Sequence, residues 1–176
     1  MPDGLIVRPA GAEDDEAIDS VIRAAFAGTD FGHQGEAELV RMIDADGDAL
    51  VSLVAERGGV IVGHVLFSRM DVEANGAPLA AAGLGPVSVA PEGQGQGIGD
   101  ALIRAGLEDM RAQNVAISFV LGHESYYPRF GYSPELATRF ASPFAGAHFM
   151  AMMLDSRAPW PLGGRADYAP AFGRMG

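Results

Sequence analysis

The sequence predicts a single α/β (α+β) domain in which strands and helices share one core. The chain has 176 residues, of which 48% are hydrophobic and 20% charged, the size and balance of one globular domain. Two strand-like runs at residues 50–56 and 60–71 flank the tight turn Arg57-Gly58-Gly59, which is the pattern of a hairpin. A third strand-like run at 80–89 leads through a glycine-rich segment into a helix over 97–113. That helix has one narrow polar stripe, as expected when a helix covers a sheet.

The remaining elements follow from hydrophobic periodicity and from turn residues. They are expected at residues 5–7 (strand), 13–26 (helix), 39–43 (short helix), 116–121 (strand), 125–130 (short helix) and 149–154 (last strand). Prolines and adjacent glycines after Asp155 predict a mostly irregular tail. We therefore expect one domain over residues 1–155 and a C-terminal extension over residues 156–176 that packs on the same domain.

Composition excludes several functions. The chain has 23 acidic and 12 basic residues, a formal charge of −11, and all its bases are Arg. Without Lys there is no Walker A loop, and so acidic a surface disfavours nucleic acid as a partner. The absence of Cys excludes disulfides and thiolate metal sites and fits a reducing, cytoplasmic compartment. No metal-ligand spacing occurs among the four His, and the longest uncharged stretch, residues 74–91, carries three prolines, so no membrane helix is expected.

The most informative stretch runs from the 80–89 strand into the following helix. Four glycines alternate there, at positions 93, 95, 97 and 99. Such glycines let backbone N–H groups approach a ligand, and the helix N-terminus adds unpaired donors, so the segment can bind a phosphate without a basic side chain. Taken alone, a flexible surface loop explains the same glycines. A dinucleotide site is excluded because no window completes G-x-G-x-x-G.

Pro86 lies inside the strand that precedes this loop. Because proline cannot donate to a sheet ladder, it indicates a sheet edge or a bulge. With Gly83 and Gly85, it predicts a strand whose C-terminal half splays from its neighbour. Such a strand leaves the N–H of Val87 and the polar groups of Val89 free for an extended ligand. The alternative is that this strand is simply at an edge.

A second motif, Tyr126-Tyr-Pro-Arg-Phe-Gly-Tyr132, follows the 116–121 strand. Together with Gln94-Gly-Gln-Gly-Ile-Gly99, it resembles the GNAT superfamily of acyl-CoA-dependent N-acetyltransferases, over roughly residues 5–154. The chain is most similar to the YhbS-like branch of predicted bacterial acetyltransferases. The resemblance implies a mixed, mostly antiparallel central sheet with a splayed central strand and helices on both faces. It also implies direct transfer of an acetyl group from acetyl-CoA to a primary amine of a small molecule or peptide, with no metal.

The resemblance also implies roles for particular residues. The residues expected to bind the cofactor are Val87, Val89, Gln94, Gly95, Gln96, Gly97, Gly99, Asp100 and Tyr127. The N–H of Val87 would polarise the thioester carbonyl, and Tyr127, rather than Tyr126, would protonate the departing thiolate. A glutamate base that many members carry falls at Gly83 here, and an asparagine before the late motif is replaced near Leu121-Gly122-His123. His123, Glu36 and His64 are therefore the candidate bases.

The sequence says less about the acceptor site than about the cofactor site. The resemblance places the acceptor pocket at the 27–34 loop, with Phe26 and Phe31, and at the loops around Tyr132. The acidic balance favours a cationic amine through steering, but a solvated, solubilising surface explains it equally well. Two alternatives stay open: a non-catalytic acyl-CoA-binding or regulatory module, and a transferase that uses a longer acyl-CoA. The expected partners are acetyl-CoA and an amine, with a homodimer left open.

Overall fold

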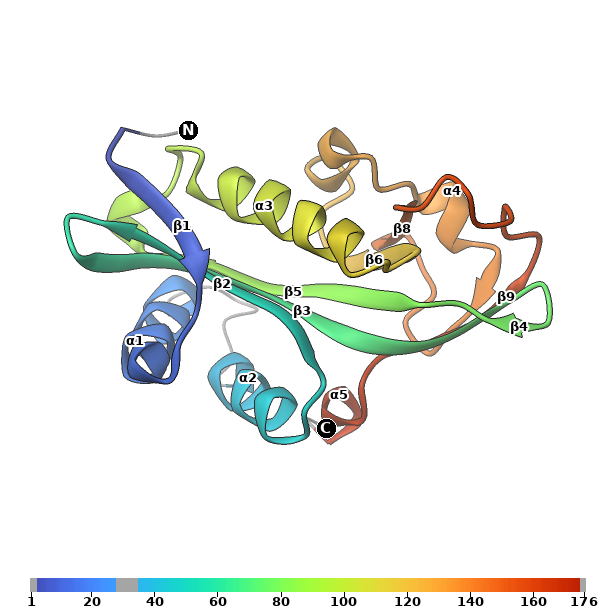
Figure 1. Cartoon of the computed structure of the whole chain (residues 1–176), viewed down its shortest axis with the longest axis horizontal. Coiled ribbons are helices and arrows are strands. Elements are labelled where there is room, and N and C mark those ends of the chain that lie inside the picture. The colour runs from blue at the N-terminus through green and yellow to red at the C-terminus, as the bar shows by residue number, and fades with distance from the viewer. Residues whose placement is uncertain (1–2, 28–34, 175–176) are drawn as a thin grey trace.

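A computed structural model of the chain describes residues 3–27 and 35–174. Its main sheet has the strand order β1-β2-β3-β5-β6-β8 (Figure 1). The strands of this path are β1 (Leu5–Pro9), β2 (Ala49–Arg57), β3 (Val60–Ala74), β5 (Ala81–Val89), β6 (Ile117–Leu121) and β8 (Phe149–Met153). Each neighbouring pair is antiparallel except β5 and β6, which are parallel. The expected mixed, mostly antiparallel sheet is confirmed.

Helices cover both faces of this sheet. The long helix α3 (Ile98–Ala112) lies on one face, and α1 (Asp15–Phe26) and α2 (Gly35–Ala45) lie on the other (Figure 1). Short helical segments connect these elements: η1 (Ala12–Asp14), η2 (Pro91–Gly93), η3 (Tyr127–Phe130), α4 (Pro134–Ala137) and α5 (Pro170–Gly173). The two-sided covering buries both faces of the central strands.

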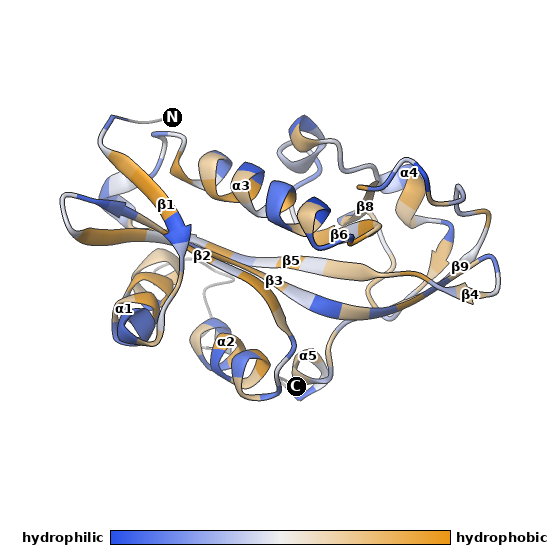
Figure 2. Cartoon of the chain, in the orientation of Figure 1, coloured by the Kyte–Doolittle hydropathy of each residue, from blue (hydrophilic) through white to orange (hydrophobic). Residues whose placement is uncertain are grey.

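The contact between α3 and the sheet is tight. The helix buries Ile98, Leu102, Ile103, Leu107 and Met110 against the sheet, and its hydrophobic and hydrophilic stretches alternate in Figure 2. Gly106 lets the helix approach most closely, since a Cβ there would lie 2.1 Å from Cε2 of Phe67. The narrow polar stripe in the sequence therefore predicted the burial of this helix correctly.

The C-terminal tail is mostly irregular, as expected, but it also contains a strand and a short helix that the sequence did not indicate. β9 (Gly164–Asp167) pairs with the far end of β3, from Asp71 to Ala74, and also with β7 (Phe140–Ala141). β4 (Ala77–Pro78) pairs with the same end of β3. β8 is consequently not the last strand. Four residues, of which Ala166 alone is buried, are too few to show a strand alternation in the sequence.

Candidate active site

The strands β5 and β6 separate halfway along β5. Their parallel pairing runs from Ala81–Ile117 to Leu84–Val120 and stops there. At the same point the register of β5 against β3 shifts, because Val65 pairs with Val87 but Phe67 pairs with Leu84. Gly85 and Pro86 thus oppose a single residue of β3, which is a β-bulge. The splayed strand and the bulge at Pro86 are both confirmed, and β5 is an interior strand rather than an edge.

The alternation of an antiparallel ladder fixes which way the backbone of β5 points. The N–H of Ala90 donates to the carbonyl of Val62 at 2.9 Å. Residues two apart in such a ladder face the same neighbour, so Ser88 also faces β3. Val87 and Val89 therefore direct their N–H and C=O groups toward β6, where the pairing has ended. One of these groups is occupied: Gln94 Nε2 donates to the carbonyl of Val89 at 3.1 Å.

The glycine loop leads from this gap into α3. Gly95 and Gly97 have φ values of 78° and 83°, a left-handed conformation that glycine adopts without strain. Gly97 is the N-cap residue of α3 and has no side chain to cap the helix. The first N–H groups of the helix, from Ile98 onward, therefore have no intrahelical partner, and the helix dipole adds partial positive charge. This arrangement can bind an anion through the backbone.

Two glutamine side chains of the loop brace it internally. Besides the contact of Gln94 with Val89, Gln96 Nε2 donates to the carbonyl of Glu92 at 3.1 Å. Arg57, at the end of β2, donates to Gln96 Oε1 at 2.9 Å. Both polar atoms of the Gln96 amide and the Nε2 atom of Gln94 are thus engaged within the protein. The contact with Arg57 had no signal in the sequence.

The structure brings the loop, the splayed strand and the late motif together. A Cβ built on Gly99 would lie 3.6 Å from the hydroxyl of Tyr126 and 3.8 and 3.9 Å from the side chains of Val89 and Val87. Tyr126 Oη donates to Asp100 Oδ1 at 2.5 Å. Arg129 lies over the Tyr126 ring, 4.3 Å from its centroid, and Nη1 is 3.8 Å from Asp100 Oδ2. The carboxylate of Asp100 is therefore held by the late motif.

Tyr127 lies beside Tyr126 but is held differently. Its ring packs edge-on against Tyr126 and Tyr132, and a Cβ on Gly122 would lie 2.3 Å from its Cε2 atom. Burial raises the pKa of Tyr127, so its phenol stays protonated at neutral pH. Among the described residues, no hydrogen bond engages its hydroxyl. Of the two tyrosine hydroxyls, only that of Tyr126 has a partner among the described residues.

The candidate bases lie in three different places. The side chain of His123 is exposed, and its carbonyl accepts the N–H groups of Tyr126 at 3.1 Å and Tyr127 at 3.3 Å, which starts η3. Glu36 is in the first turn of α2, on the face opposite α3. His64 is fully buried in β3, where Nε2 is 2.9 Å from Ser52 Oγ. These three side chains therefore do not form one cluster.

Gly83 is where the resemblance places a glutamate base in many relatives. A Cβ at Gly83 would lie 2.6 Å from Cε1 of Tyr168, which belongs to the C-terminal extension. The ring of Tyr168 thus takes the space that a side chain at position 83 would need. Nothing in the sequence indicated this contact, because the two residues are far apart in the chain.

Part of the expected acceptor pocket cannot be placed. Residues 28–34, including Phe31, lie outside the residues that the structure describes. Phe26 packs in a cluster with Ile22, Ala37 and Val54 at the α1–α2 side of the sheet.

Neither a metal site nor a membrane helix is found among the described residues. Within residues 3–27 and 35–174, no group of three or more His, Cys, Asp or Glu is placed to hold a metal ion. In the same part of the chain, no helix is long and apolar enough to span a bilayer.

A pair of parallel strands that separate next to a glycine loop and a helix N-terminus is typical of transferases that use acyl-CoA. Residues 7–134 match the family model described as an acetyltransferase (GNAT) domain, and this chain belongs to that family. Both the fold and the family expected from the two motifs are confirmed.

Similar proteins include two from Escherichia coli K12 that are called uncharacterized N-acetyltransferases. YjhQ is 43% identical over 107 residues, and the match spans 59% of each chain, less than two thirds of that relative's length. YhbS is 31% identical over 129 residues, 73% of each chain. The expected similarity to the YhbS branch is confirmed.

Solved structures extend the similarity to nearly the whole chain. A GNAT family acetyltransferase from Brucella melitensis, in complex with acetyl-CoA, is 34% identical with a TM-score of 0.79, covering 96% of this chain and 97% of that one. YhbS from Escherichia coli, in complex with CoA, is 27% identical with a TM-score of 0.85, covering 98% and 93%.

Proposed function

We propose that this protein is an acetyl-CoA-dependent N-acetyltransferase that transfers the acetyl group directly to a primary amine. The observation that carries the proposal is the end of the β5–β6 pairing at Leu84, right before Val87 and the glycine loop. The bound acetyl-CoA and CoA in the two similar structures support the same ligand here.

The backbone would hold the cofactor. The pantetheine arm would take the place that β6 vacates and pair with Val87 and Val89 like an added strand. The diphosphate would accept N–H groups of Gly95, Gly97, Gly99 and Asp100 at the start of α3. The protein has a net charge of −11, so its acidic side chains repel an anion. Main-chain N–H donors at a helix N-terminus would bind the diphosphate without requiring basic side chains.

Direct transfer of the acetyl group makes three chemical demands on the protein, of which protonation of the leaving thiolate is the third. An oxyanion develops on the thioester carbonyl, and the N–H of Val87 would stabilise it; loss of one such donor typically costs about 3–4 kcal/mol. The amine must lose a proton, because an alkyl ammonium has a pKa of about 10.4. His123 and Glu36 are proposed for this step, directly or through water. No acyl-enzyme on sulfur can form in a chain without Cys.

Tyr127 would protonate the leaving thiolate. The thiolate, whose conjugate thiol has a pKa near 8.5, is a weaker base than phenolate, whose conjugate acid has a pKa of about 10. Burial raises the pKa of Tyr127 further, which alone would disfavour the transfer. Desolvation of the thiolate in the gap would also raise the pKa of the thiol, which offsets the effect of burial on Tyr127.

The proposal also covers the extension over residues 156–176 as part of the same domain. It is supported by the pairing of β9 with β3 and by the contact of Tyr168 with Gly83. A cytoplasmic location is part of the proposal, and the cysteine-free sequence is compatible with it.

The test measures acetyl-CoA binding and turnover separately. Titration calorimetry should show saturable binding of acetyl-CoA, and a panel of amines should release free CoA thiol with at least one member. By hydrogen exchange, the amides of Val87 and Val89 should be unprotected in the free protein and slow once CoA is bound. Protection of both amides without CoA would contradict the open gap. Binding without turnover on any amine would favour the non-catalytic module, and tighter binding of longer acyl-CoA would favour the other acyl donor.

A further inference from the structure

A cavity of about 780 Å³ lies on the face of the sheet that α1 and α2 cover. Its lining comes from these two helices, from the β1–α1 connection and from β2 and β3. Among the described residues, none that lines it belongs to β5, β6 or the glycine loop. The volume falls in the range of about 300–1,000 Å³ typical of small-molecule sites, and this space is separate from the gap proposed for acetyl-CoA.

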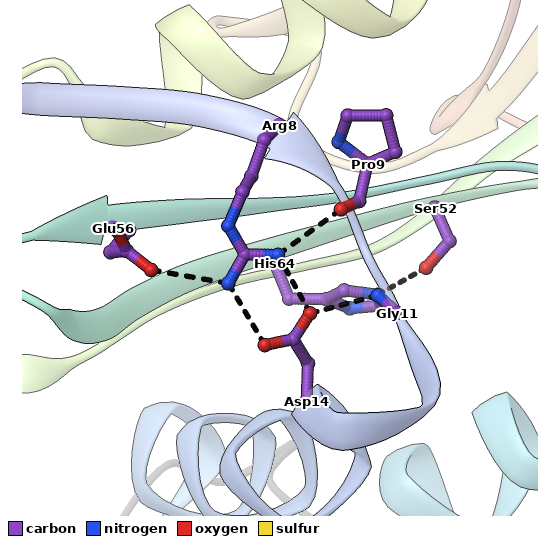
Figure 3. A network of polar contacts seen from close by, with 7 residues as sticks. All are labelled: Arg8, Pro9, Gly11, Asp14, Ser52, Glu56 and His64. Atoms are coloured by element: carbon purple, nitrogen blue, oxygen red, sulfur yellow. Dashed lines mark hydrogen bonds and ion pairs between the residues drawn. The ribbon is translucent and has the colours of Figure 1, made fainter.

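The inner end of the cavity carries an unsatisfied polar group. His64 lines the cavity and is 0% exposed, and its Nε2 atom is engaged with Ser52 Oγ, which also lines it (Figure 3). Nδ1 of His64 is buried and has no hydrogen-bond partner among the described residues. A buried polar atom without a partner is unfavourable. A ligand that forms a hydrogen bond with Nδ1 would remove this deficit.

The rim of the cavity is acidic. Asp15, Glu16 and Asp44 line it and are exposed, and they form no ion pair within the described part of the chain. By contrast, Asp19 is neutralised by Arg41 at 2.6 Å and by Arg23 at 2.8 Å. Asp44 lies in the last turn of α2, where the helix dipole disfavours an anion and no basic residue is present. A cation bound at the rim would reduce the repulsion among these carboxylates.

Between the rim and the inner end, Ile18, Ile22, Val40 and Leu66 supply aliphatic surface.

The β1–α1 connection forms one wall, and the Arg8–Asp14 pair fixes it. Both carboxylate oxygens of Asp14 accept from Arg8, at 2.8 and 2.9 Å, and Asp14 also accepts the N–H of Gly11 at 2.8 Å (Figure 3). Arg8 further reaches Glu56 at 3.1 Å. The wall is therefore formed before any ligand arrives.

We propose that this cavity is a second small-molecule site, distinct from the acyl-transfer gap, for a short aliphatic cation. Its ammonium group lies among Asp15, Glu16 and Asp44, its methylene chain lies against the aliphatic side chains, and a polar group at its other end forms a hydrogen bond with Nδ1 of His64. A short diamine or amino alcohol has this chemistry. Because no described residue of β5, β6 or the glycine loop lines the cavity, we place the bound cation outside the acyl-transfer gap.

Calorimetry on the full-length chain tests the proposal with putrescine and 4-amino-1-butanol as probes and 1,4-butanediol as the uncharged control. At least one amine should bind saturably, with the same affinity in the absence and presence of saturating CoA, while the diol should not bind. Binding of the diol as tightly as the amines, or no saturation by either amine, would overturn the proposal.

A matched pair of variants locates the site. Asp15→Asn/Glu16→Gln/Asp44→Asn removes three charges at the rim, and Glu108→Gln/Asp109→Asn/Glu124→Gln removes three exposed charges elsewhere. The rim variant should weaken amine binding about tenfold and the control variant less than about twofold. If both variants weakened amine binding equally, the attraction would come from the overall negative charge of the protein, and the proposed site would be refuted.

Different results would refute this proposal and the proposed function. If the amine is acetylated and the rim variant raises its KM in proportion to its Kd, the cavity is the acceptor site and the separate-site proposal is wrong. Loss of amine binding when CoA is bound would also refute it. Neither result would affect acetyl-CoA binding at the gap.

Discussion

The phenol of Tyr126 donates a hydrogen bond of 2.5 Å to the carboxylate of Asp100, across the junction between the late motif and α3. This bond uses the proton of Tyr126 and, together with burial, raises its pKa. The adjacent Tyr127 carries no such bond among the described residues. The two hydroxyls therefore differ in their hydrogen bonding, although the two tyrosines are neighbours in the sequence.

Replacing Tyr127 by Phe should therefore lower kcat by about 100-fold or more, since a positioned general acid contributes roughly 10²–10⁴-fold. Affinity for CoA should change less than about twofold, because the aromatic packing remains. Steady-state release of CoA thiol with an active amine, and calorimetry with CoA, measure the two effects. Turnover equal to that of the unmodified protein would remove the assigned role.

The matched control is Tyr126→Phe. It should keep most of kcat and lower the free energy of unfolding by about 1–2 kcal/mol, because the bond to the Asp100 carboxylate is lost. A loss of kcat in this variant as large as in Tyr127→Phe would mean that the two roles are exchanged or shared.

Gly97 should be more sensitive to substitution than Gly99. A Cβ at the left-handed φ of Gly97 costs about 1–2 kcal/mol, and relief of that strain would turn the helix N–H groups away from the diphosphate. Gly97→Ala should weaken CoA binding about tenfold. Gly99→Ala places its Cβ at ordinary contact distances within a helix, so its effect should be smaller. Calorimetry of both variants, with unfolding curves, checks this order.

His64 should make stability depend on pH. Burial lowers its pKa from 6.5 to about 4, so between these values the unfolded chain binds a proton that the folded protein does not. The free energy of unfolding should therefore fall as the pH drops from about 6.5 toward 4, by up to about 3 kcal/mol from this group. Denaturant unfolding at a series of pH values should show a shallower fall for His64→Gln. The exposed control His123→Gln should retain the original slope; identical slopes for all three proteins would contradict the assignment.

Gly83 and Tyr168 should be energetically coupled. Gly83→Ala forces a Cβ to 2.6 Å from the Tyr168 ring and should destabilise the fold by about 1–3 kcal/mol. In a Tyr168→Leu background the same substitution should cost much less, because the ring is gone. A double-mutant cycle of unfolding free energies measures the coupling. Additive effects would show that the two residues do not constrain each other.

The elements with strong local patterns were predictable. The hairpin of β2 and β3, the buried side of α3 and the splayed half of β5 follow from periodicity, from the polar stripe and from Pro86. The glycine loop and the late motif were found for the same reason: each is a contiguous run of residues. β9 and α5 were missed because four-residue elements carry no periodic signal, and they are stabilised by pairing with β3 and by the burial of Ala171.

The sequence by itself determined the family, the glycine loop that leads into a helix N-terminus and the net acidic charge, since these depend on residue type and on spacing within one segment. The tertiary structure decided which of the two tyrosine hydroxyls has a hydrogen-bond partner, why no side chain fits at Gly83, and that the acids of α1 and α2 share a cavity with His64. Each of these depends on atoms that are distant in the chain and meet only when the sheet and helices pack. Local pattern cannot encode such contacts, because many different packings satisfy the same periodicity.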